Sequence, residues 1–130
     1  MSDALKALLA SDLNIEKNVH IKRLGVDFIV KALTDETLEE AREEATHFVG
    51  KGAKQKKEVD TRMLGGLLIS KACVEPDFNH VELIKAKGAK DAADVVTKTL
   101  LPGEIEKLQM AILELSGFED DEEEIEEVKN

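Results

Sequence analysis

The sequence is poor in several residue types, and each scarcity excludes a class of protein. It has one cysteine, two prolines, four phenylalanines, no tryptophan and no tyrosine among 130 residues. A single cysteine, Cys73, excludes a framework of disulfide bonds within the chain. No segment near the N terminus is apolar enough for a signal peptide or long enough to cross a bilayer. We therefore expect a protein of the reducing cytoplasm, without a membrane partner.

The shortage of aromatic residues also limits how a core can be built. Leucine, isoleucine, valine, alanine and methionine must supply most of its volume, and such a composition favours helices over a sandwich of sheets. A length of 130 residues is typical of one domain with a core of modest size. We expect one domain that is mostly helical.

Charge is distributed unevenly along the chain. Residues 119–130 hold eight acidic residues against one lysine, a net charge of −7 out of −10, which leaves −3 for residues 1–118. A run with so few apolar residues cannot bury enough surface to offset the entropy of ordering. The pattern predicts a single domain over residues 1–118 and a disordered, solubilising tail over residues 119–130. A docking site for a basic partner is the alternative for this tail.

The N-terminal part predicts a short helix and then a β-hairpin. Ser2 can cap a helix whose Leu5, Leu8 and Leu9 fall on one side. Apolar residues then alternate with a period of two, and Leu24-Gly25 suits a tight turn between two strands. A hairpin alone is marginal in water, so helices are expected to cover its apolar face. The two strand faces are expected to hold Val19, Ile21 and Arg23, and Val26, Phe28, Val30 and Ala32.

Helical periodicity returns after the predicted hairpin, from about Thr34. A cap is available at Thr34 or Thr37, and Thr37 with Glu40 matches a capping box. Gly50 and Gly52 are expected to stop this helix and open a loop. Its buried stripe is expected to hold Leu38, Ala41, Ala45 and Phe48.

The segment after Asp60 predicts the most buried helix. Gly65-Gly66 within it indicates close approach of a neighbouring helix, or else a bend. Cys73 is placed on this helix as a small core residue and not as a nucleophile. Two further helices are expected, a short one with Phe78, Val81 and Ile84, and one over Asp91 to Leu101 with Ala92, Val95, Val96 and Thr99.

The last helix has a clear apolar stripe and a recognisable end. Gly117 is expected to adopt the left-handed conformation, with Phe118 folding back on Leu113 in a Schellman motif. Together these patterns predict an α+β fold, mostly α-helical, with an N-terminal β-hairpin packed on a bundle of about four to five helices. The stripe of the last helix comprises Ile105, Leu108, Ile112 and Leu115.

No group of residues points to catalysis or to a bound cofactor. His20, His47 and His80 lie far apart and match no zinc-site spacing. The glycines lack the rest of a phosphate-binding motif, and the acidic tail lacks the spacing of a calcium loop. Four lysines cluster between Lys51 and Lys57, but without interleaved aromatic residues they predict a solvated loop and not a nucleic-acid site. We expect no enzyme activity, metal, cofactor or nucleic-acid partner.

Three segments taken together resemble a known family. VHIKRLGVDFIVKALTDE looks like its opening, LLISKACVEPDF is similar to its middle, and LLPGEIEKLQMAILELSGF with an acidic run after it is similar to its end. The family is that of the XkdN-like tail assembly chaperones of phages and prophages in Gram-positive bacteria. The resemblance covers about residues 19–118, and its closing segment is the most specific part.

This resemblance implies a cytoplasmic protein that is absent from the finished virion. It would bind the long, helical tape measure protein and help to recruit tail tube subunits around it. Families of this kind often make a second, longer form by a programmed frameshift, and this chain would then be the short form. The family supplies no functional residues that can be transferred one by one.

A face for a partner can still be suggested from periodicity. Helical modules with apolar stripes can offer a groove or a face to another amphipathic helix. Met110, Leu113 and Phe118 fall outside the main stripe of the last helix and lie next to the acidic tail, so they are the candidate partner-binding residues. The alternative is that they complete a broad core face.

Two other functions remain open at this point. An acidic regulator could dock on a basic partner, such as a polymerase or a DNA-binding protein, through residues 119–130. The nearly balanced charge of the preceding residues argues against a DNA mimic. A structural virion protein is disfavoured because long strands for tube packing are lacking. Self-association into a homo-oligomer is left open.

Overall fold

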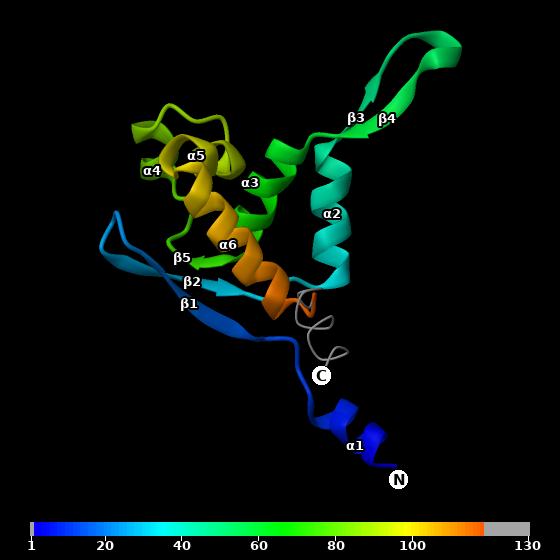
Figure 1. Ribbon diagram of the computed structural model, residues 1–130, viewed down its shortest axis with the longest axis vertical. Helices are drawn as coiled ribbons and strands as arrows, with labels where there is room; N and C mark the ends of the chain where they lie inside the picture. Colours follow the sequence, from blue (N-terminus) through cyan, green and yellow to red (C-terminus); the bar gives the residue numbers. More distant parts are fainter. Residues whose placement is uncertain (1, 119–130) are drawn as a thin grey trace, which may run out of the picture.

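A computed structural model describes residues 2–118 of the chain (Figure 1). It confirms the α+β fold, and its described residues form six α-helices, five short strands and one 3₁₀ turn. The predicted acidic tail, residues 119–130, lies outside the described residues. The elements are α1 (Asp3–Ala10), β1 (Glu16–Ile21), β2 (Val26–Lys31), α2 (Asp35–Ala45), β3 (Thr46–Val49), the turn Gly52–Lys54, β4 (Lys56–Val59), α3 (Thr61–Ala72), β5 (Cys73–Glu75), α4 (Val81–Ala86), α5 (Ala92–Thr99) and α6 (Pro102–Leu115).

The predicted hairpin is confirmed as β1 and β2, which pair in antiparallel register with Val19 opposite Phe28. Gly25 turns the chain between them at φ +67°, in the left-handed region that glycine adopts without steric cost. The strand β5 pairs with the other edge of β2, so the sheet has the order β1-β2-β5. Three expected strand residues differ: Arg23 lies beyond the end of β1, Ala32 lies beyond the end of β2, and Val26 is 51% exposed.

The helix α3 is the centre of the molecule. Its neighbours are α2, α5 and α6, and α6 also packs on the sheet (Figure 1). Phe28 and Phe78 add an edge-to-face aromatic contact beside it, with ring centroids 6.1 Å apart. The buried residues of α3 are Gly65, Gly66, Leu67, Leu68, Ile69 and Ala72.

The glycine pair of α3 is explained by close packing. A Cβ on Gly66 would lie 2.8 Å from the carbonyl oxygen of Ala93 in α5. A Cβ on Gly65 would collide with the side-chain amide of Gln109 in α6. The predicted close approach of a neighbouring helix is therefore confirmed, and two helices approach at successive positions.

One long-range ion pair ties the hairpin turn to the helices. The Arg23 guanidinium donates to both carboxylate oxygens of Glu104, at 2.8 Å for the closest contact, and also to the Thr99 carbonyl. The same carboxylate accepts from the Leu101 backbone N–H at 2.8 Å, which satisfies a free donor at the start of α6. The hydrogen bond from Arg23, followed by that from Leu101, holds the pKa of Glu104 below its ordinary value.

The end of α6 follows the predicted pattern. Gly117 has φ +93°, and the Phe118 N–H donates to the Leu113 carbonyl at 3.0 Å. The Gly117 N–H donates to the Glu114 carbonyl at 3.1 Å, which completes the Schellman pair of hydrogen bonds. Ser116 then anchors this end, because its hydroxyl accepts from the Leu33 N–H at 2.9 Å.

The expected end of α2 was wrong. The helix ends at Ala45, and Phe48 lies on β3 with 62% of its surface exposed, instead of completing a buried stripe. The residues after Ala45 pair with β4 through the register Thr46↔Val59 and Phe48↔Lys57. A β-branched residue at each end of β3 favours this extended pairing over a further helical turn.

Two details of local structure also differ from expectation. Thr34 caps α2 by accepting from the Thr37 N–H at 3.2 Å, so Thr37 lies inside the helix and forms no capping box with Glu40. Cys73 is buried as predicted, but it begins β5 and does not belong to α3. Both differences arise at helix ends, where neighbouring residues offer competing caps.

Candidate functional site

Apolar side chains that no part of the core covers gather on α1 and the linker after it. Ser2 caps α1 by accepting from the Leu5 N–H at 3.1 Å, and no residue of α1 is buried. The exposed fractions of Leu8 and Leu9 are 72% and 69%. We call this surface the N-terminal leucine face: Leu5, Leu8, Leu9, Leu13 and Ile15.

The helix α1, which carries most of the leucine face, projects away from the body at one end of the molecule (Figure 1). Its linker is held at one point, where the Ala32 N–H donates to the Ile15 carbonyl at 2.8 Å beside the end of β2. Sequence periodicity predicted that Leu5, Leu8 and Leu9 share one side of a helix. It could not reveal that the side is uncovered, because a core-facing stripe and a partner-facing stripe have the same period.

Of the predicted partner-binding residues, Met110 lies on the opposite side of α6 from its core stripe, Leu113 lies on the flank of that stripe, and Phe118 follows the end of the helix. Met110 is 59% exposed and Phe118 is 53% exposed, whereas Leu113 is half-buried. The core stripe of the same helix contains Leu108 and Ile112, which are fully buried. We call Met110, Leu113 and Phe118 the α6 patch, and its role in binding stays a prediction.

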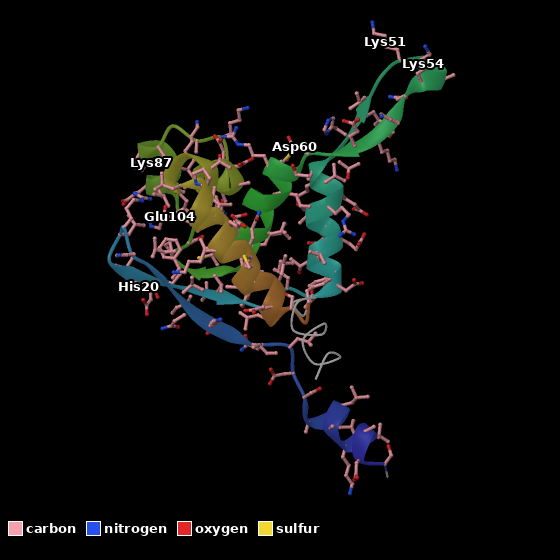
Figure 2. All side chains as sticks on the ribbon, viewed as in Figure 1. His20, Lys51, Lys54, Asp60, Lys87 and Glu104 are labelled. Atoms are coloured by element: carbon pink, nitrogen blue, oxygen red, sulfur yellow. The ribbon has the colours of Figure 1, made fainter. Side chains whose placement is uncertain are left out.

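A second projecting element is the hairpin of β3 and β4, which we call the lysine arm (residues 46–59). It projects beyond the C-terminal end of α2, and Lys51 and Lys54 lie at its tip (Figure 2). The predicted solvated loop is thus the end of a two-stranded ribbon. At its base, the Asp60 N–H donates to the Ala45 carbonyl at 2.8 Å. The Lys57 ammonium lies 5.8 Å from the centre of the Phe48 ring.

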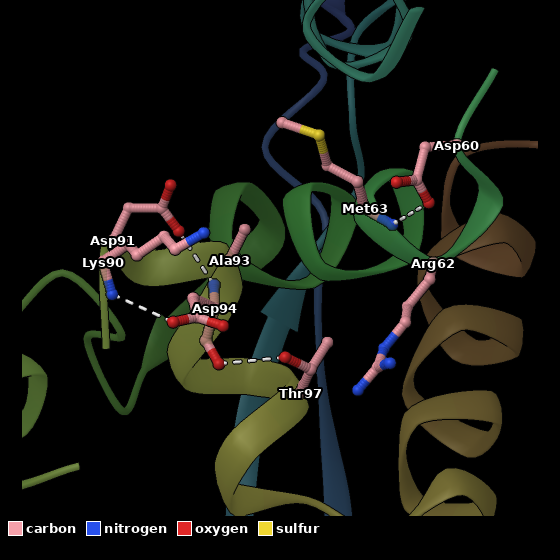
Figure 3. Close-up of a pocket in the computed structure, with 8 residues that line it drawn as sticks. All are labelled: Asp60, Arg62, Met63, Lys90, Asp91, Ala93, Asp94 and Thr97. Atoms are coloured by element: carbon pink, nitrogen blue, oxygen red, sulfur yellow. Dashed lines mark hydrogen bonds between the residues drawn. The ribbon is translucent and has the colours of Figure 1, made fainter. Parts of the chain in front are cut away.

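The carboxylates around a hollow of about 450 Å³ already have structural partners (Figure 3). Asp60 accepts from the Met63 N–H at 3.0 Å, and Asp91 accepts from the Asp94 N–H at 2.9 Å, so both cap helices. Asp94 accepts from the Lys90 N–H, and that bond, then one from Lys98, lowers the pKa of its carboxyl. These carboxylates therefore stabilise the starts of helices instead of standing free for a ligand.

The one cysteine is buried, and the three histidines lie on different elements of the structure. Burial raises the pKa of the Cys73 thiol to about 12, so the nucleophilic thiolate is scarce at neutral pH. His20 contacts Asp27 at 2.7 Å on the surface, His80 caps α4, and His47 lies on the lysine arm. Over residues 2–118, the structure places no three His, Cys, Asp or Glu side chains where they could hold a metal ion. Within the same range, no helix is both long and apolar enough to traverse a bilayer.

The chain is similar in sequence to known proteins. The family model described as "Phage XkdN-like tail assembly chaperone protein, TAC" matches residues 5–129. The XkdN protein of the phage-like element PBSX of Bacillus subtilis (strain 168) is 31% identical over 104 residues, which cover 78% of this chain and 70% of that protein. The uncharacterized protein YqbN of the same strain is 33% identical over 104 residues, with the same coverage.

A solved structure shares the fold. The crystal structure of the protein YqbN superposes with a TM-score of 0.66 at 21% identity, and the match covers 92% of this chain and 98% of that one. At 21% identity, the structural match shows a shared fold. The family model and the two relatives match in sequence, so they show common descent. From these matches, this chain belongs to the XkdN-like family of phage tail assembly chaperones.

Proposed function

We propose that this chain binds the tape measure protein of its phage element and keeps it soluble while tail tube subunits assemble around it. The role is non-catalytic and belongs to the bacterial host cytoplasm, before the virion is complete. The observation that carries the proposal is the N-terminal leucine face, a set of large apolar side chains that the body of the chain leaves uncovered.

The leucine face suits a helical partner. Leu5, Leu8 and Leu9 are spaced by three and four residues, the spacing by which one amphipathic helix lies against another. Burying a leucine side chain contributes about 1.5–3 kcal/mol, so a few such residues supply a substantial part of a binding free energy. A tape measure protein would expose matching stripes until the tube covers it, and a chaperone that masks them opposes aggregation.

The α6 patch is the second contact that we propose. Its exposed Met110 offers an unbranched, adaptable side chain, which is typical of surfaces that bind varied apolar partners. Both surfaces are apolar and include exposed residues of a helix, so a long helical partner can use each for the same kind of contact. Tail tube protein is a further partner in this proposal.

The experiment is co-expression with the tape measure protein of the same element, followed by affinity capture and size-exclusion chromatography. We expect a soluble complex of fixed stoichiometry, with the tape measure protein insoluble when it is expressed alone. If the complete chain captures no tape measure protein, the proposed partner is wrong.

Variants then locate the contact. Leu8→Glu with Leu9→Glu should abolish the complex, because two charges would replace the most exposed leucines of α1. The matched control is Val26→Glu with Val81→Glu, which places the same charges at exposed apolar positions of the body and should leave the complex intact. Met110→Glu tests the α6 patch separately, and an unchanged complex would remove that patch from the proposal.

A further inference from the structure

The helix α2 and the lysine arm form two consecutive segments of opposite charge. Residues 35–45 contain six acidic residues and one arginine, a net charge of −5. Residues 46–59 contain four lysines and one glutamate, a net charge of +3 with neutral histidine. Figure 1 shows the arm continuing outward from the C-terminal end of α2. The chain therefore carries a charged rod whose sign changes at about its middle.

The acidic half of this rod faces solvent. Ala41 and Ala45 are the buried residues of α2, and they lie on the side that packs on α3. Glu36, Glu40 and Glu43, spaced by four and three residues, fall on the opposite side of the helix and are exposed. We call these three residues the acidic stripe. Glu39 and Glu44 differ, since they pair with Arg42 and Lys71.

The basic half is exposed and incompletely stabilised. No residue of the lysine arm is buried, and an isolated two-stranded hairpin is marginal in water. Phe48 and Val59 share one face of the ribbon with Lys57, so this face combines apolar surface with positive charge. An element of this kind gains stability when a surface of complementary charge covers it.

The two halves also match in length. Eleven residues of α2 rise about 16 Å, and each four-residue strand of the arm extends about 13 Å. If two rods of this kind lie antiparallel, each positive half meets a negative half, and the same contact occurs twice about a two-fold axis. A rod cannot make this contact with itself, because the arm points away from α2 of its own chain (Figure 1).

We propose that two copies of this chain associate in an antiparallel pair, with the lysine arm of each copy lying along the acidic stripe of the other. The contact joins Lys51, Lys54 and Lys57 to Glu36, Glu40 and Glu43, while Phe48, which lies on the same ribbon face as Lys57, loses its exposure to water. Each chain has a net charge of −10, so two copies repel at long range and the pair is reversible and concentration-dependent.

The test is sedimentation velocity of the complete chain over a dilution series, with two charge-reversed variants. One variant carries Lys51→Glu, Lys54→Glu and Lys57→Glu, and the other carries Glu36→Lys, Glu40→Lys and Glu43→Lys. We expect the unchanged chain to form dimers and each variant alone to sediment as a monomer. In an equimolar mixture, the acidic arm of the first variant can meet the basic stripe of the second, and the basic arm of the second can meet the acidic stripe of the first. Both contacts are then attractive, so the two variants should form a heterodimer.

A matched control separates local pairing from overall charge. Lys85→Glu, Lys87→Glu and Lys90→Glu change the net charge by the same amount as the arm variant at exposed positions around α4 and α5. This control should dimerise as the unchanged chain does.

Three results would overturn the proposal. The unchanged chain could remain monomeric throughout the series, or the mixed variants could form no heterodimer. Alternatively, dimers could survive reversal of the acidic stripe and vanish when the glutamates of residues 119–130 are changed to glutamine. That last result would make the acidic tail, and not α2, the surface that receives the arm.

Discussion

The body of the molecule and its two projections, α1 and the lysine arm, differ in whether their apolar side chains are buried. In the body, the α3 glycines bring helix backbones close enough that one added methyl group would meet the Ala93 carbonyl oxygen at 2.8 Å. In the projections, Leu8 is 72% exposed and Phe48 is 62% exposed. The same apolar residue types thus stabilise the fold in one region and remain available to a partner in the other. Burial, and not residue type, separates structural residues from candidate binding residues.

The largest effect on folding should come from a cavity in the body. Ile69 is fully buried on α3, so Ile69→Ala should lower the free energy of unfolding by about 2–5 kcal/mol through lost burial and an unfilled cavity. Leu8→Ala removes a similar volume from α1 and should change it by less than about 0.5 kcal/mol. Urea denaturation measures both values, and equal losses would mean that α1 packs on the body.

Two glycine-to-alanine variants test how tightly the body is packed. Gly66→Ala should destabilise the fold by about 1–3 kcal/mol, since the new methyl group meets backbone that cannot move freely. Gly103→Ala, near the start of α6, meets nothing within 4 Å and should stabilise the fold by about 0.4–1 kcal/mol. Thermal unfolding of the two variants should therefore shift in opposite directions. A rise in melting temperature for Gly66→Ala would show that α3 and α5 can separate at little cost.

The ion pair of Arg23 and Glu104 should make stability depend on pH. A carboxyl whose pKa is lower in the folded than in the unfolded chain stabilises the fold above its unfolded-state pKa. For Glu104 that contribution is lost as the pH falls from its ordinary value of 4.5 through its lower folded-state pKa. Glu104→Gln should therefore reduce stability near neutral pH and have progressively less effect in acid. Denaturation at several pH values checks this, with the exposed Glu106→Gln on the same helix as the control.

The smallest effect on partner binding is expected from the acidic tail. Changing the glutamates of residues 119–130 to glutamine should lower solubility because net charge falls, but it should leave capture of the tape measure protein intact. Affinity capture with this variant distinguishes the chaperone from an acidic regulator. If the variant loses every partner, the tail is the binding element and the regulator hypothesis replaces the proposed function.

Local signals allowed much of the fold to be predicted. The cap at Ser2 and the left-handed Gly117 act through hydrogen bonds within five residues, so both were predicted correctly. The alternation of apolar and polar residues located β1 and β2, because this pattern also depends only on near neighbours in the chain. Competing local signals led to the two misplaced features of α2, because Thr34 and Thr37 can both cap and the stripe of apolar residues continues to Phe48. The candidate site was harder to predict from the sequence. Periodicity suggested the α6 patch, whose role stays a prediction, but it did not indicate that the leucines of α1 are uncovered.

The sequence by itself determined where chain segments become helical or extended, and its three characteristic segments indicated the family. Periodicity and capping depend on neighbours a few residues apart, so they can be read along the chain. Only the tertiary structure decided which apolar stripes are covered. Ile112 is buried because α6 packs on α3 and the sheet, whereas Leu8 remains exposed because no element among residues 2–118 buries any residue of α1. Likewise, Phe48 became a strand residue through its pairing with Lys57, a contact that exists only when the chain has folded back on itself.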